Sequence, residues 1–258
     1  MQKRSILFGF IAGLLVTAIV LFILFIIPKK EEGKGYDSAE GALLAYLTAL
    51  KSLDYNEALS TFAIETAVEK MSLRESIELE EKYVYFYGTE RFFDMYSTDD
   101  FSEKSMIEGR KRLINTYMIA PFYRVCMGLY GEESSPGVVH YDNIENFDAE
   151  YIHGRDTEKI ISDMEIGEIY RLEELPYVLA VSEEEIAVLL DQRQKMLQAD
   201  DIAVLAAEIR IDGEDYIILM QSVCYGKKWY NFMASENPLF KAKTDNGGLI
   251  RSDELILK

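Results

Sequence analysis

The sequence predicts an α+β fold in which one N-terminal transmembrane helix precedes a helix-rich domain that closes in an antiparallel meander. Three observations support this prediction. They are an unbroken apolar run at 6–27, helical patterns over most of 37–121 and after Ser182, and a strand-like pattern after Asp201. We therefore divide the chain into a leader, a transmembrane helix, a linker, a folded domain and a polar tail, at 1–5, 6–27, 28–36, 37–240 and 241–258.

The apolar run at 6–27 has the length and composition of a membrane-spanning helix. It contains no charged residue and no proline, and its 22 residues rise by about 33 Å in a helix. A hydrocarbon core is about 30 Å thick. A cleaved signal peptide would have a shorter apolar part of about 7–15 residues, ending at a small-x-small site. We therefore expect an uncleaved, single-pass signal anchor in the lipid bilayer.

The flanking charges of this helix leave its orientation to other arguments. Lys3 and Arg4 precede it and three lysines follow it within seven residues, so the positive-inside rule gives nearly a tie. A five-residue leader is too short for an external domain, and long domains cross the membrane largely regardless of their charge. We expect a cytoplasmic N-terminus and an extracytoplasmic C-terminal domain in the cell membrane.

Small residues recur every four positions in the predicted anchor, at Gly9, Gly13 and Thr17. That spacing places them on one helix face, where small side chains let two backbones approach closely. Two interpretations stay open. The face pairs two copies into a homodimer, or the glycines reflect only the frequency of glycine in membrane helices.

The charge beyond residue 30 limits the partners of the domain. All 45 acidic residues lie there, with 23 of the 27 basic residues, so this part has a net charge of −22. Such a field opposes nucleic acid and anionic lipid headgroups. Calcium would need an Asp-x-Asp-x-Asp-Gly loop, which the sequence lacks. We expect no metal and no cofactor.

Helical patterns open the domain. Residues 37–40 form a capping-box pattern with Asp37 as the cap, and leucines follow at helical spacing. Residues 51–54 interrupt this helix before a second one at 55–62. Residues 66–96 and 101–121 have a mostly helical pattern, and Ser182 starts another capping box before an amphipathic helix that includes Ile186, Leu189, Leu190, Arg193 and Leu197.

Strand patterns dominate the end of the domain. Asp212-Gly213 is a hairpin-turn dipeptide between two predicted strands, and Gly226-Lys227-Lys228 is a second turn signal. The predicted strands are 147–153, 168–172, 202–211, 216–224 and 229–233.

Two stretches resemble nuclear-transport-factor-2-like domains of the bacterial, membrane-anchored envelope type. The opening at 39–59 (AEGALLAYLTALKSLDYNEAL) is similar to their first helix and its step into a second. The close at 223–230 (VCYGKKWY) is similar to their final hairpin, which has a Gly-Lys-x-Trp-Tyr turn. The resemblance implies a cone-like, curved antiparallel sheet around helices, with an apolar pocket. Residues from about 65 to 180 would then be a helical insertion.

Candidate reactive residues are few. His153 lies near Asp156, but residues three apart on a strand face opposite ways, so we expect no catalytic residue. Tyrosines at 83, 85, 87, 225 and 230 either pack a sheet against helices or line a ligand pocket or groove. Cys126 and Cys224 have apolar neighbours, so we expect buried thiols, with a single bridge as the alternative.

These expectations give one leading function and two alternatives. The leading one is a non-enzymatic, membrane-anchored binding or interaction domain of the bacterial cell envelope, with an envelope protein or a small apolar ligand as partner. One alternative is a structural subunit of an envelope or secretion machine. The other is a small-molecule enzyme whose pocket lies in a cone-shaped fold.

Overall fold

The computed structural model describes residues 33–72, 74–75, 102–119, 122, 125, 156–179, 182–234 and 249–258. The chain divides into two compact units, Met1–Glu31 and Glu32–Lys258, and every described residue belongs to the second. The predicted transmembrane helix at 6–27, with its leader and its Gly9, Gly13 and Thr17 face, lies outside the described residues. Within the described ranges, no helix is long and apolar enough to cross a bilayer.

An antiparallel sheet forms the centre of the domain. In the described part of the chain it has five strands, in the order β1-β2-β3-β4, with β5 also paired to β3. The predicted meander at the end of the domain is therefore confirmed. Its strands are β1 (Glu165–Arg171), β2 (Asp201–Ile211), β3 (Glu214–Tyr225), β4 (Lys228–Ala234) and β5 (Leu249–Arg251).

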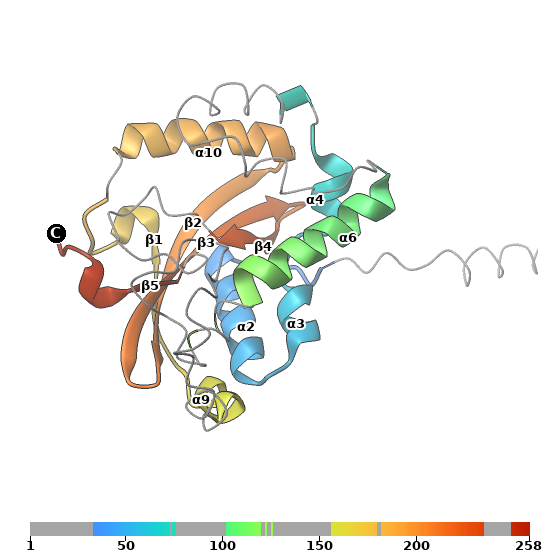
Figure 1. Ribbon diagram of the computed structural model, residues 1–258. Coiled ribbons are helices and arrows are strands. Elements are labelled where there is room, and N and C mark those ends of the chain that lie inside the picture. The colour runs from blue at the N-terminus through green and yellow to red at the C-terminus, as the bar shows by residue number, and fades with distance from the viewer. Residues whose placement is uncertain are drawn as a thin grey trace, which may run out of the picture. The chain divides into compact units, whose positions relative to one another are not determined.

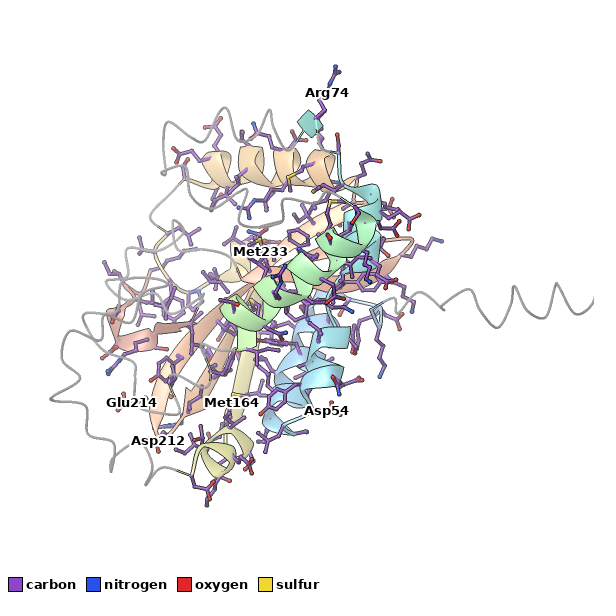
Figure 2. The ribbon with its side chains drawn as sticks, turned by 45° about the vertical axis from the view of Figure 1, so that its right-hand side comes forward. Asp54, Arg74, Met164, Asp212, Glu214 and Met233 are labelled. Carbon is purple, nitrogen blue, oxygen red and sulfur yellow. The ribbon has the colours of Figure 1, made fainter. Side chains whose placement is uncertain are left out.

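Two tight turns set the register of the meander. Asp212 and Gly213 have φ angles of 53° and 82°, the left-handed values that a two-residue hairpin loop requires. Gly226 and Lys227 repeat this geometry, at 58° and 72°, between β3 and β4. Figure 2 shows Asp212 beside Glu214 at the tip of the first hairpin. Both predicted turns are confirmed.

Both faces of the β2–β3 hairpin are buried. On one face Leu205 and Ile218 pack in the cluster that contains Leu43 and Leu47. On the other face Val204 and Leu219 pack with Ile186. Strand β3 is consequently buried at ten consecutive positions, from Tyr216 to Tyr225. Apart from Gln221 and Ser222 these residues are apolar, which is typical of a strand that is covered on both sides.

Helices cover the two faces from opposite sides (Figure 1). Ser182 caps the helix on the second face in a complete capping box, as predicted. The cap of the first helix differs from the prediction, because Ser38 accepts from the Gly41 amide while Asp37 pairs with Lys228. The helices are α2 (Ala39–Lys51), α3 (Tyr55–Ser60), α4 (Glu65–Lys70), α6 (Glu103–Ile114), which continues as a π-helical turn (Asn115–Ile119), α9 (Thr157–Ser162) and α10 (Glu183–Leu197).

The last ten residues correct the prediction of a polar tail over 241–258. Leu249 and Ile250 are fully buried in β5, beside β3. The chain then returns along 176–178, where the Val178 amide donates to the Ile256 carbonyl at 2.7 Å. The end of the chain is therefore part of the folded domain.

The predicted linker at 28–36 is also folded from residue 33 onward. Tyr36 and Trp229 exchange both backbone hydrogen bonds, at 2.9 and 2.8 Å, so this segment pairs with the edge of β4. The Lys34 amide donates to the Ser60 carbonyl at 2.6 Å. A Cβ on Gly35 would lie 2.7 Å from the Lys228 Cβ, so the approach requires glycine. We call residues 33–37 the strap.

We predict that Gly35→Val detaches the strap. The added side chain overlaps Lys228 and the Tyr230 ring, and overpacking of this kind costs about 1–3 kcal/mol. Thermal unfolding should show the loss, and trypsin should cleave after Lys34 faster than in the native chain. Val188→Ala is the control, because Val188 is 52% exposed on another element, so the change should affect neither stability nor cleavage after Lys34. Native stability together with unchanged cleavage in Gly35→Val would contradict a docked strap.

Candidate functional site

The sheet face under α2 is one candidate place for the apolar pocket that the family resemblance implies. Packed side chains occupy the described part of this face. Tyr46 is fully buried and makes edge contacts with Phe62 and Phe122, with ring centroids 5.3 and 6.3 Å apart. Its hydroxyl donates to the Met118 carbonyl at 2.8 Å. Burial raises the pKa of Tyr46 well above its usual value, so this tyrosine is a neutral packing residue.

The polar side chains on this face are joined to one another. Asn231 of β4 is fully buried, and its Nδ2 donates to the Ala42 carbonyl at 2.8 Å and to Thr61 Oγ1 at 3.0 Å. Thr61 Oγ1 donates to the Ala58 carbonyl at 2.7 Å. Ser222 of β3 makes a longer contact to Asn231 Oδ1, at 3.5 Å. These bonds hold α2, the turn after α3, β3 and β4 together.

Arg110 is a fully buried cation on α6. Its Nε donates to the Ala63 carbonyl at 2.6 Å, its Nη2 donates to the Phe232 carbonyl at 2.8 Å, and its guanidinium lies 4.0 Å from the centre of the Phe232 ring. Two backbone acceptors and an aromatic face compensate part of the lost hydration. Arg110 thus clamps α6 to β4 and to the start of α4. The helical pattern of the sequence does not distinguish Arg110 from the exposed Arg112, so the burial of Arg110 was not predicted.

Of the residues singled out from the sequence, those that the structure describes cap a helix or pack in the interior. Asp156 caps α9, with its Oδ1 accepting from the Lys159 amide at 3.0 Å. Tyr225 donates to the Leu197 carbonyl at 3.1 Å and packs with Tyr230 against helices, as the packing alternative predicted. Cys224 is a buried free thiol whose pKa is raised by burial. His153, Cys126 and the tyrosines at 83, 85 and 87 lie outside the described residues.

One polar cluster lies near the edge of the sheet. The Tyr170 hydroxyl is 2.8 Å from Glu168 Oε2 and 3.2 Å from Glu208 Oε1. The hydrogen bond to Glu168, then burial and then the Glu208 charge raise the pKa of Tyr170. A phenol with a raised pKa is a poor general acid or base near neutral pH. In the ranges that the structure describes, no three acidic, histidine or cysteine side chains are grouped so as to hold a metal ion.

We predict that Arg110→Lys destabilises the domain strongly. Lysine cannot reach both carbonyls in the same geometry or stack on Phe232, and a buried cation that loses its partners costs about 3–5 kcal/mol. The urea midpoint of unfolding measures this cost. Arg112→Lys on the exposed side of the same helix is the matched control and should lie within about 0.5 kcal/mol of the native chain. Equal midpoints for the two variants would show that Arg110 is not a clamp.

Comparison with known proteins adds one likeness of fold. No protein-family model matches the chain, and no curated protein matches it. A solved structure, a cystatin-like protein from Ruminococcus gnavus ATCC 29149, superposes with a TM-score of 0.44 at 16% identity. The match covers 85% of this chain and 46% of that chain, so this chain spans about half the length of its structural neighbour. A likeness at this level supports no assignment of function.

Proposed function

We propose that the chain is a non-enzymatic interaction domain of the bacterial cell envelope, held to the membrane by the helix predicted at 6–27. The observation that carries the proposal is the docked strap. Residues 33–37 pair with β4 through the Tyr36–Trp229 bonds and are fixed further by Lys34–Glu57 and Asp37–Lys228 ion pairs. Only residues 28–32 separate the strap from the apolar run in the sequence. A strap built into the sheet suits a tether better than a loose linker would.

We propose a nuclear-transport-factor-2-like relationship for the domain. Two features support it. Helices α2 and α3 occupy the opening stretch of the resemblance, and the Gly226-Lys227 turn of its closing stretch joins β3 to β4. The antiparallel sheet packs one face on α2, as the resemblance implied.

The packing under α2 favours a protein partner over an enzyme pocket. An enzyme pocket would bring titratable groups together with hydrogen-bond donors around a space for substrate. On the described part of this face, the donors of Asn231, Thr61 and Tyr46 are used in bonds to the protein itself. The charge of the domain further favours a partner that is neutral or basic at the contact.

Fractionation of cells that produce the native chain or a variant lacking 6–27 tests the proposal. The native chain should stay with membranes through a carbonate wash, and protease added to spheroplasts should degrade its domain. The deletion variant should be released. A native chain that is released by carbonate, or a domain that added protease leaves intact, would contradict the anchor or its orientation.

Cross-linking in the same membranes tests pairing and partners. A dimer through Gly9, Gly13 and Thr17 should weaken in Gly13→Ile, and an unchanged dimer band would exclude that face. Co-purification of several membrane proteins in fixed ratio would favour the structural subunit of an envelope machine over a single interaction domain.

A further inference from the structure

The sheet face opposite α2 has a polar side chain between two apolar clusters. Leu219, Gln221 and Val223 of β3 share this face, since alternate residues of a strand point the same way. Leu219 packs in a cluster with Ile186 near the start of α10. Val223 packs in another with Met196 and Leu197 at the end of α10. Gln221 therefore lies beneath the middle of α10, which runs along this side of the sheet (Figure 1).

Gln221 is buried without a donor for its side-chain oxygen. The residue is 2% exposed, and its Oε1 accepts no hydrogen bond in the part of the chain that the structure describes. Its backbone is held in register between Val204 of β2 and Met233 of β4, so the side chain cannot turn to solvent without breaking the sheet. A buried amide oxygen of this kind is normally paired, because leaving it unpaired costs its full desolvation.

Helix α10 has polar residues near its middle, between the positions that pack in the two apolar clusters. Arg193 follows Ile186 by seven positions and precedes Leu197 by four, so these residues share the face of α10 that packs on the sheet. Gln192 precedes Met196 by four, and its Oε1 is also buried and accepts no hydrogen bond. We call Gln192, Arg193 and Gln221 the polar band.

We propose that the polar band binds a small zwitterion of the amino-acid class. The two amide oxygens are acceptors suited to an ammonium group. The guanidinium of Arg193 has five N–H donors and can hold a carboxylate beside its existing contacts. The apolar clusters at either end of α10 suit an aliphatic side chain. This site lies on the opposite face of the sheet from α2, and the proposal does not depend on the function proposed above.

Calorimetric titration of the purified full chain in mild detergent tests the proposal, with L-leucine as the reference probe and the other common amino acids in turn. At least one amino acid with an aliphatic side chain should bind saturably and raise the unfolding temperature. For L-leucine, 3-methylbutylamine lacks the carboxylate and 4-methylpentanoate lacks the ammonium group. Each should bind at least tenfold more weakly. No saturable binding by any amino acid would overturn the proposal and leave an ordered water as the partner of Gln221.

Variants locate the binding. Gln221→Met keeps the length of the side chain, removes its polar atoms and should weaken binding at least tenfold. Lys195→Ala is the control. The Lys195 side chain of α10 is 62% exposed, so this variant should bind as the native chain does. Unchanged binding in a folded Gln221→Met would place the ligand elsewhere and overturn the proposal. If Gln221→Met does not fold, the isosteric Gln221→Glu decides. Its carboxylate should attract the ammonium group and so strengthen the binding of 3-methylbutylamine. Unchanged binding of that amine would overturn the proposal.

Discussion

Burial of the β2–β3 hairpin on both faces is the constraint on which the rest of this domain depends. The two strands pair without interruption from Asp201–Cys224 to Ile211–Glu214. Because side chains alternate, a slip of one residue would exchange the faces of every one of them. Such a slip would turn the Gln221 side chain toward α2 and break the contact between Ser222 and Asn231. The Asp212-Gly213 turn excludes that slip by fixing the register, so it also determines which polar groups face each helix layer.

Buried polar groups lie under both helix layers. On the α2 side, Asn231 and Thr61 donate to protein acceptors, and Tyr46 does the same. On the α10 side, the amide oxygens of Gln192 and Gln221 accept no hydrogen bond. The resemblance to cone-shaped domains would place a ligand on the α2 side. Our proposal of a bound zwitterion places the ligand on the α10 side instead, because two amide oxygens meet there, whereas the Tyr36 hydroxyl is a single buried group beside α2 without a hydrogen bond among the described residues.

Local signals predicted much of this fold. The Asp212-Gly213 turn, the Ser182 capping box and the helix break before Asp54 each depend on a few adjacent residues, and each is present. Features set by distant contacts were missed. Leu249 and Ile250 form too short an apolar pair to predict a strand. They are in a strand because their backbone pairs with β3. The stretch at 28–36 was predicted to be a linker, because its sequence does not show that Gly35 permits a close approach to β4. The burial of Arg110 and Gln221 depends on which face each residue occupies.

Thiol labelling tests the two-sided burial most directly. Leu219→Cys places a thiol on the α10 side, Ile218→Cys places one on the α2 side, and Val188→Cys is the control because Val188 is 52% exposed. Mass spectrometry identifies the labelled position apart from the native cysteines. We predict that the thiols at positions 218 and 219 react only at the rate of global unfolding, while the thiol at position 188 reacts at once. Labelling at 219 as fast as at 188, with 218 still protected, would show that the sheet is covered on one face only and contradict the account.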